Sequence, residues 1–362
     1  MDKVNSYRIL ALNPGSTSTK LGLFENERAV FQENVKHEEN ELAPYAKRPL
    51  VDQLELRLAA VLGRLEARGA DPAGFDAVVG RGGLLRPLAS GTYAVGARML
   101  AELKEAKRGD HASNLGAPMA LALASRAAAG RAFIVDPVSV DEWTPVARLS
   151  GLEGLDRECL SHALNTKAVA KRYAREKGVR YADLRLVVAH LGSGISVSAH
   201  EGGRMVDVTN SMEEGAFSTE RSGSVPVMKL VRLCFSGKHS EKEVAAMIFR
   251  RGGIASYLGT KDVPEVLRRS AAGDEKAKLV FDSMVYQIAK EIGAMATVLE
   301  GRVDAILLTG GMAHDRAVVE AVERRVGRIA PVRVHPGEDE LAALAEGAIR
   351  VLRGEEEAIE YR

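Results

Sequence analysis

The stretch LNPGSTSTK, residues 12–20, combines a glycine, four consecutive hydroxyl residues and a lysine. Backbone N–H groups of a tight turn can surround an anion, the hydroxyls of residues 16–19 add donors, and Lys20 adds a positive charge. The stretch is not the G-x-x-x-x-G-K-[ST] motif, and LGLFE after it is typical of a strand rather than a helix. Alone, this composition also suits an ordinary hairpin turn. The chemistry it suggests is phosphate binding by a turn between two strands.

A second stretch repeats the first. ILALNPGSTSTKLGLFENERAV (residues 9–30) aligns without a gap on LVVAHLGSGISVSAHEGGRMVD (residues 186–207), so that Asn13 meets His190 and Gly15 meets Gly192. Both stretches indicate strand, Gly-Ser turn, strand, short turn and strand. We therefore expect a duplicated domain, with the two turns gripping a polyphosphate from both sides of a cleft.

A third glycine turn lies in LLTGGMAHD, residues 307–315, where a buried strand runs into Gly310-Gly311 and then a helix. Glycines at such a place let a flat ligand approach the backbone. One such turn is an ordinary strand-to-helix connection, but three glycine turns together favour a nucleotide-binding protein.

Composition limits the classes of function. A chain of 362 residues predicts about two domains. A net charge of +1 provides no overall field for nucleic acid or a membrane surface, so we expect neither as a partner. Two cysteines, Cys159 and Cys234, make no disulfide framework, and no leader or membrane-spanning segment is evident. We expect a cytoplasmic protein.

Hydrophobic periodicity predicts alternating strands and helices, and so the α/β class. Strands are expected at 6–13, 20–26, 28–37, 75–81 and 131–137, within 184–210, and at 303–311 and 332–335; helices at 50–68, 97–107, 114–129, 157–176, 225–234, 240–250, 262–271, 275–300, 315–327 and 339–353. No linker marks a boundary. We expect an N-terminal domain at 1–150 and a C-terminal nucleotide-binding domain at 151–339.

The three turns resemble the two phosphate loops and the adenosine loop of the superfamily of acetate and sugar kinases, heat-shock cognates and actin. Five further motifs, taken in order, resemble the acetokinase family and, within it, the members that act on butyrate: VVGRGGLLRP (78–87), DHASNLGAP (110–118), IVDPVSVDEWTPVAR (134–148), SHALNTKAVAKR (161–172) and EEGAFSTERSG (213–223). The resemblance runs from about residue 6 to 353.

This resemblance implies two duplicated ribonuclease-H-like domains around an interdomain cleft, with a C-terminal helix at about 340–362 packing back on the first domain. It implies ATP or ADP with Mg²⁺ as cofactors and phosphorylation of a short-chain carboxylate, butyrate or a branched-chain analogue, to the acyl phosphate. It also implies a homo-oligomer, a dimer or higher.

The resemblance also assigns roles to residues at matching positions. Arg221, Arg81, Asp136 and His162 match catalytic residues, with Arg86 an alternative to Arg81. Residues that match the substrate and phosphate sites are Asn13, Gly15, Ser16, Ser18, Lys20, His111, His190, Gly192, Ser193 and Gly194. Thr309, Gly310, Gly311 and Met312 match the nucleotide site. Glu340, with Asn13, is expected to hold the metal, although Glu338 and Asp339 are adjacent alternatives.

Elementary chemistry agrees with such a reaction. A short-chain carboxylic acid has a pKa near that of Glu, about 4.3, so the acceptor is already ionised at pH 7 and needs no general base. The obstacle is repulsion between two anions, which arginine, lysine, histidine and Mg²⁺ at the centre would offset. Ala216, Thr219 and Ser193 depart from the usual family residues, which leaves the preferred acid open.

Three alternatives remain at this stage. A kinase for a sugar hydroxyl would need a general base, and we find no acidic motif of that kind. A nucleotide-binding regulator would usually carry an extra peptide- or DNA-binding module, for which two domains leave little chain. A histidine metallohydrolase is disfavoured because the eight histidines show no H-E-x-x-H or H-x-H spacing.

Overall fold

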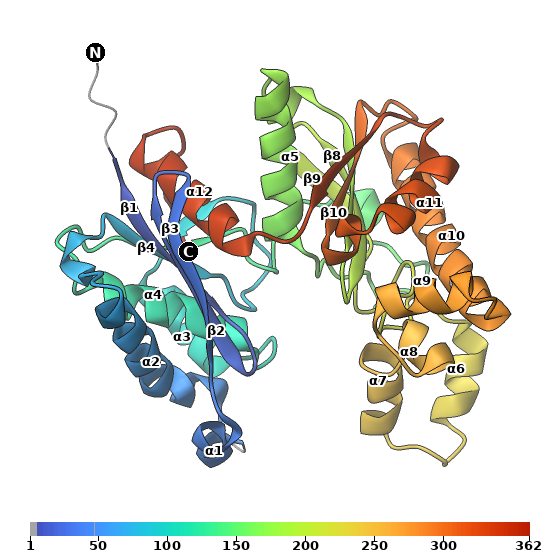
Figure 1. Ribbon diagram of the computed structural model, residues 1–362, viewed down its shortest axis with the longest axis horizontal. Coiled ribbons are helices and arrows are strands. Elements are labelled where there is room, and N and C mark those ends of the chain that lie inside the picture. Colours follow the sequence, from blue (N-terminus) through green and yellow to red (C-terminus); the bar gives the residue numbers. More distant parts are fainter. Residues whose placement is uncertain (1–5, 47) are drawn as a thin grey trace. The chain divides into compact units, whose positions relative to one another are not determined.

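The computed structural model describes residues 6–46 and 48–362, which form two compact units (Figure 1). The first unit is Met1–Asp141 with Asp339–Arg362, and the second is Glu142–Glu338. Each unit contains one β-sheet with helices packed against it. The predicted α/β class is therefore confirmed.

The sheet of the first unit has seven strands in the order β12-β5-β6-β4-β1-β2-β3. Their bounds are β1 (Arg8–Pro14), β2 (Ser18–Glu25), β3 (Arg28–Lys36), β4 (Ala77–Arg81), β5 (Thr92–Ala94), β6 (Ala132–Val135) and β12 (Ile359–Glu360). The helices are α1 (Glu39–Leu42), α2 (Leu54–Ala67), α3 (Ala97–Glu105), α4 (Gly116–Ala124) and α12 (Glu340–Leu352).

Hydrophobic burial fixes this first sheet between helices. β1 and β4 are parallel neighbours, and their apolar runs are buried on both faces. One face packs against α2 and α4 through residues such as Leu10, Leu58 and Met119. On α12, the Gly347 backbone packs against Val135 of β6, and the helix also contacts β1, β2 and β4.

The sheet of the second unit has five strands in the order β11-β10-β7-β8-β9. Their bounds are β7 (Leu186–Leu191), β8 (Ile195–Glu201), β9 (Arg204–Val208), β10 (Ala305–Gly310) and β11 (Val332–Pro336). The helices are α5 (Ala163–Lys177), α6 (Val227–Cys234), α7 (Glu241–Phe249), α8 (Gly253–Leu258), α9 (Val263–Ala271), α10 (Glu275–Val298) and α11 (Arg316–Val326).

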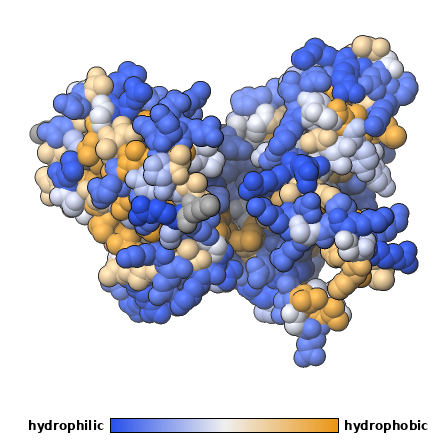
Figure 2. Space-filling model, turned by 90° about the horizontal axis from the view of Figure 1, so that it is seen from below, coloured by the Kyte–Doolittle hydropathy of each residue, from blue (hydrophilic) through white to orange (hydrophobic). Residues whose placement is uncertain are grey.

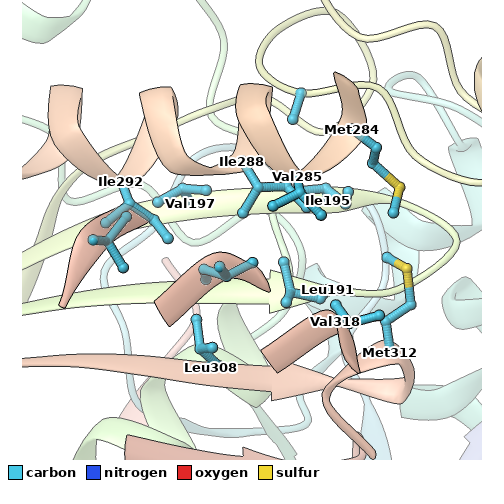
Figure 3. Close-up of a cluster of buried hydrophobic side chains, with 14 of the residues drawn as sticks. Leu191, Ile195, Val197, Met284, Val285, Ile288, Ile292, Leu308, Met312 and Val318 are labelled. Carbon is cyan, nitrogen blue, oxygen red and sulfur yellow. The ribbon is translucent and has the colours of Figure 1, made fainter. Parts of the chain in front are cut away.

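Alternate residues of β7 supply the two cores of this unit. Val187, Ala189 and Leu191 face a large cluster under α10 and α11, part of which is shown in Figure 3. Leu186 and Val188 belong to a smaller cluster under α5. This period of two is the pattern of a strand buried on both faces.

The two sheets repeat one arrangement. Strands β3-β2-β1-β4-β6 of the first unit correspond in order and direction to β9-β8-β7-β10-β11 of the second, each an antiparallel hairpin followed by parallel strands. The gap-free alignment was wrong in one detail. Asn13 pairs with Lys20 in its hairpin, whereas His190 pairs with Ser196, so the second turn is one residue shorter.

Three predicted helices have different bounds in the structure. The C-terminal helix expected at about 340–362 ends at Leu352, and Ile359–Glu360 form β12 instead. The helix expected at 157–176 begins only at Ala163, because the Arg157 N–H bonds to Arg148 O and the Leu160 carbonyl accepts from Ser211 N, which holds this segment extended. The helix expected at 114–129 ends at Ala124, where the backbone bonds change to i to i−3 turns. β5, β12, α1 and α8 were not predicted, because such short segments show no period.

Glycines allow α4 to approach β4 closely. A Cβ on Gly80 would lie 2.1 Å from the Gly116 carbonyl oxygen, and a Cβ on Gly116 would lie 2.0 Å from the Arg81 carbonyl oxygen. The same approach seats Asn114, whose Oδ1 accepts from Leu84 N at 2.9 Å. The contact therefore sets the position of the strand end that carries Arg81.

We expect Gly116→Ala to lower the free energy of unfolding by about 3 kcal/mol, because a methyl group cannot fit without separating helix and strand. Urea denaturation measures this. Gly63→Ala is the matched control, since Gly63 lies inside α2, where an added methyl group would meet no atom within 4 Å, and should gain about 0.5–1 kcal/mol. Equal stability of Gly116→Ala and the wild type would contradict the packing argument.

No helix among the described residues is long and apolar enough to cross a membrane. The face shown in Figure 2 is covered mostly by hydrophilic residues, with smaller hydrophobic patches between them. Cys159 and Cys234 are not joined in a disulfide, and the first is buried while the second is exposed.

Candidate active site

The first phosphate-like turn connects β1 and β2 and leaves its hydroxyl residues accessible. Ser16, Thr17 and Lys20 are exposed, whereas Asn13 is buried at the end of β1. The Gly15 N–H donates to the Ser18 carbonyl at 2.7 Å, which closes the turn. A Cβ on Gly15 would meet nothing closer than 3.4 Å, so this glycine is not required by the shape of the turn.

Asn13, Arg81 and Glu340 form one cluster in the first unit. They come from the ends of the adjacent strands β1 and β4 and from the first turn of α12. Arg81 Nη1 lies 2.8 Å from Glu340 Oε1 and donates to Asn13 Oδ1 at 3.4 Å, while Asn13 Nδ2 donates to Glu340 Oε2. This cluster brings together a predicted catalytic arginine and the predicted metal residues.

The alternative residues Arg86, Asp339 and Glu338 have other partners or belong to the other unit. Arg86 lies over the Tyr361 ring, with its guanidinium carbon 4.8 Å from the ring centroid, so the geometry favours Arg81 over Arg86. Asp339 caps α12 by accepting from Ala342 N, and Glu338 belongs to the second unit. Of the three consecutive acids, Glu340 bonds to Asn13 and Arg81.

His111 lies near the same arginine. Its Nδ1 accepts from the Ser113 N–H at 3.2 Å, which leaves the proton of a neutral ring on Nε2. Partial burial and, secondly, the charge of Arg81 lower the pKa of His111. Because its ordinary pKa is near 6.5, the ring is mostly neutral at pH 7 and can donate one hydrogen bond.

Asp136 lies directly after β6 and holds the turn that precedes β5. Its Oδ1 accepts from Ser90 Oγ at 2.6 Å and from Gly91 N at 2.8 Å, and no arginine bonds to it among the described residues. Its φ of 37° is left-handed, which is unusual for a residue other than glycine. Asp136 therefore organises the turn before β5, and it follows Val135, which pairs with Arg81 of the Asn13 cluster in the sheet.

In the second unit, two predicted histidines stack on each other. The rings of His162 and His190 are parallel within 10°, with centroids 3.8 Å apart. His162 Nδ1 lies 2.9 Å from Ser196 Oγ, and His190 Nδ1 lies 2.9 Å from Asn165 Oδ1. Two side chains that sequence reasoning did not select thus hold the predicted pair.

Asn165 also fixes the tautomer of His190. Its Nδ2 donates to the Gly337 carbonyl at 3.4 Å, so its Oδ1 must accept, and Nδ1 of His190 carries a proton. Nε2 of the same ring lies 3.2 Å from Glu338 Oε1. The available signal was spacing, because Asn165 stands three residues after His162, where a helix presents the same face.

The guanidinium of Arg221 lies across the second phosphate-like turn, residues 192–194. A Cβ on Gly194 would lie 2.4 Å from Arg221 Nη1, so only glycine lets the guanidinium lie there. Arg221 Nη1 donates to the carbonyl and hydroxyl oxygens of Ser211, both at 3.1 Å. Ser218 Oγ donates to Ser193 O and accepts from Arg221 N, which ties the arginine turn to this loop.

Arg221 has no carboxylate partner among the described residues. The two oxygens that accept hydrogen bonds from its side chain both belong to Ser211, which is neutral. Burial lowers the pKa of Arg221, and the nearby charge of Glu220 partly offsets this effect. A guanidinium remains protonated under all ordinary conditions, so this group offers a positive charge for an anion.

Beside this loop the second unit contains a pocket of about 560 Å³. It is lined by Gly192, Ser193, Thr219, Lys261, Val263, Pro264, Gly311, Met312, His314, Asp315 and Glu338. The mixture of apolar and polar lining suits a small ligand. Gly311 and Met312 were predicted here, and Thr219 is one of the departures from the family pattern.

Thr309 and Gly310 end β10, directly before the pocket residues Gly311 and Met312. Thr309 is buried and donates to Gly337 O at 3.0 Å. Gly310 has a φ of 88°, and a Cβ on it would lie 2.5 Å from Leu191 O. Both residues join β10 to β7, which carries His190, rather than line the cavity.

The donor set of the first unit fits Mg²⁺ that is shared with phosphates. Among the described residues no three His, Cys, Asp or Glu side chains gather into a metal cage. Mg²⁺ usually keeps several waters and takes one or two carboxylates plus phosphate oxygens. The carboxylate of Glu340 and the amide oxygen of Asn13 are ligands of this kind.

Comparison with known proteins gives consistent results. The sequence profile of the acetokinase family matches residues 157–335. Butyrate kinase 1 of Clostridium acetobutylicum is 49% identical over 357 residues, which cover 98% of this chain and 100% of that protein.

Solved structures also resemble this one. The acetate kinase of Porphyromonas gingivalis has a TM-score of 0.80 at 20% identity, covering 96% of this chain and 100% of that one. A propionate kinase of Francisella tularensis has a TM-score of 0.74 at 16% identity, covering 94% and 98%. At these identities the likeness shows the fold alone.

Proposed function

Because the chain belongs to the acetokinase family, we propose that it transfers the γ-phosphoryl group of ATP to a short-chain carboxylate. The acceptor is butyrate or a branched-chain analogue, the product is the acyl phosphate, and the reverse reaction makes ATP. The observation that carries the carboxylate acceptor is Arg221, a guanidinium that lies across the second phosphate-like turn without a carboxylate partner among the described residues.

The reaction balances without a general base. A carboxylate oxygen forms the new bond to the γ-phosphorus, and the bond from that phosphorus to the β–γ bridging oxygen breaks, which leaves ADP with the electron pair. At 4 Å and an effective dielectric constant of 20, two unit charges interact by about 4 kcal/mol. Placing fixed positive charge and hydrogen-bond donors around the reacting groups is therefore the protein's main task.

We assign groups of each unit to this reaction. In the first unit, we assign Asn13, Gly15, Ser16, Ser18 and Lys20 to the transferring phosphate, with Arg81 and neutral His111 as donors. In the second, His190, Gly192, Ser193 and Gly194 would hold the other phosphates, and His162 would donate to a phosphoryl oxygen. Arg221 would orient the carboxylate bidentately. The adenosine would occupy the pocket at Gly311 and Met312.

Mg²⁺ would be held by Glu340 and Asn13, and when bound it neutralises charge on the phosphates. Asp136 keeps a proposed catalytic role only indirectly, through the turn at Ser90 and Gly91 that it organises. We further propose a cytoplasmic homo-oligomer. Exposed apolar residues on and beside α6, Val227, Met228 and Phe235, support contact with a second copy.

The test is ATP turnover with a panel of carboxylates, with the product trapped by hydroxylamine. We expect hydroxamate from four- and five-carbon acids, in amounts equal to the ADP released. ADP without hydroxamate would move the acceptor to a hydroxyl or to water. Tight ATP binding without any turnover would favour a nucleotide-binding regulator and contradict the proposal.

A further inference from the structure

Arg57 of α2 is a fully buried arginine that lies against the inner side of the first phosphate-like turn. Its exposed fraction is 0%. Nη2 donates to the Ser16 carbonyl at 3.0 Å, and Nη1 donates to the Ser18 carbonyl and to Thr19 Oγ1, both at 3.1 Å. Nε and Nη2 donate to Gln53 Oε1 at 3.0 and 2.9 Å.

These bonds use every donor of the side chain and no anion. A guanidinium has five N–H groups, and each of the five bonds ends on a neutral carbonyl, hydroxyl or amide oxygen. No ion pair joins Arg57 to a carboxylate within the described chain. Burial lowers the pKa of Arg57 to about 10, so the group is still charged at pH 7.

The imidazole that shares Thr19 with Arg57 does not compensate this charge. His37 Nε2 lies 2.9 Å from Thr19 Oγ1, which itself accepts from Arg57. Burial and then the charge of Arg57 lower the pKa of His37, so this ring is neutral at pH 7. Burying an unpaired charge is costly. The arrangement is explained if the missing anion is a ligand on the outer side of the turn.

The direction of the peptide groups supports this explanation. In a trans peptide, the carbonyl oxygen and the following N–H point in opposite directions. Because the Ser16 carbonyl points at Arg57, the N–H of exposed Thr17 points away from the buried side of the turn. The Thr17 carbonyl accepts from His37 N, which fixes the next peptide group as well. The turn is thus held with donors facing outward.

We propose that Arg57 is a positioning residue of the phosphate site, which fixes the turn through the carbonyls of Ser16 and Ser18 and supplies an unpaired positive charge to a bound phosphate. This inference rests on the assignment of the turn to the phosphates of ATP in the proposed function. It adds to the positive charge of Lys20 and Arg81 that of a side chain which never reaches the ligand.

Gln53→Glu tests the charge without removing a bond. A carboxylate at this position keeps acceptors for Nε and Nη2 and neutralises the guanidinium from inside. We expect the urea midpoint of unfolding to rise, because the buried charge gains a partner. We expect the Kd for ATP, measured by calorimetry, to rise about tenfold, because the field at the turn is lost. A purely structural Arg57 predicts the first change without the second.

Two further variants complete the experiment. Arg57→Lys keeps the charge but has three donors instead of five, so ATP affinity should stay within about threefold while kcat falls because the turn is no longer fixed. Gln32→Glu adds the same charge on exposed β3. Lys36 of this strand pairs with Ser18 of the turn, and Gln32 lies four residues, or about 13 Å, along the strand from Lys36. Beyond a Debye length this control should leave the Kd within about twofold.

A Kd of Gln53→Glu within about twofold of the wild type would overturn the proposal. So would a Kd of Arg57→Lys that rises as far as that of Gln53→Glu, because Arg57→Lys keeps the positive charge. Because ATP binding is measured without turnover, this outcome is separate from the fate of the proposed function. A wild type that binds ATP but forms no hydroxamate would refute the carboxylate reaction. The Arg57 proposal would then still be decided by the Kd values for ATP.

Discussion

Replacing Arg221 with alanine should lower kcat about a thousandfold while the Kd for ATP changes less than about threefold. The guanidinium is the one group in the described second unit that lies across the 192–194 turn and has only neutral partners. It would hold the carboxylate and offset the charge that develops during transfer, whereas we propose that the turns and the pocket bind most of the ATP. Steady-state kinetics and calorimetry measure the two effects.

Two comparisons make this result specific to the guanidinium. Arg221→Lys keeps the charge but loses bidentate geometry, so it should fall between wild type and alanine. Added guanidinium chloride should restore part of the activity of Arg221→Ala and none of the activity of other variants. Arg324→Ala, at an exposed position of α11, is the matched control and should behave like the wild type. Loss of ATP binding with an unaltered carboxylate KM in Arg221→Ala would contradict the assignment.

The sequence predicted the residues that sit in turns between strands. LNPGSTSTK, HLGSGIS and LTGG were selected because each has glycine and hydroxyl residues directly after an apolar run of strand length. The structure places each of these stretches at a strand end. The β/α alternation was predictable for the same reason, since Leu186–Leu191 and Ala305–Gly310 are apolar runs of strand length. The gap-free alignment missed that the second turn is one residue shorter, because the strands on both sides of the two turns have similar apolar patterns.

The residues that support the site were not predictable in this way. Arg57 reads as an ordinary polar position of an amphipathic helix, and only the packing of α2 under the first turn shows that it is buried. Asn165 and Ser196 are conspicuous only once α5 and β8 are placed beside His190 and His162. Asp136 was matched to a catalytic residue, and only the structure shows that its carboxylate accepts from Gly91 N. These contacts depend on tertiary structure, which no local pattern records.

Glu340→Gln should lower kcat about a hundredfold and raise the Mg²⁺ concentration that gives half-maximal rate. The carboxylate holds Arg81 at 2.8 Å and receives the amide of Asn13, so its removal both frees the arginine and takes away an anionic oxygen ligand. A glutamine could still accept a hydrogen bond from either Arg81 or Asn13, but its amide nitrogen would then face the N–H donor of the other residue. Titration with Mg²⁺ at saturating ATP separates these effects, because a loss of Arg81 positioning alone lowers kcat without shifting the Mg²⁺ midpoint.

The adjacent acids provide the controls for this prediction. Asp339→Asn keeps the cap of α12, since asparagine caps as well as aspartate, and should change neither kcat nor the Mg²⁺ midpoint. Glu338→Gln removes the carboxylate 3.2 Å from His190 Nε2 in the second unit, so it should lower kcat through the histidine pair and leave the Mg²⁺ midpoint unchanged. A shifted midpoint in Glu338→Gln together with an unshifted one in Glu340→Gln would move the metal to Glu338. In that case Glu340 would serve only to hold Arg81 against Asn13, and the positive charge of Arg81 would be balanced by the protein rather than offered to the phosphates.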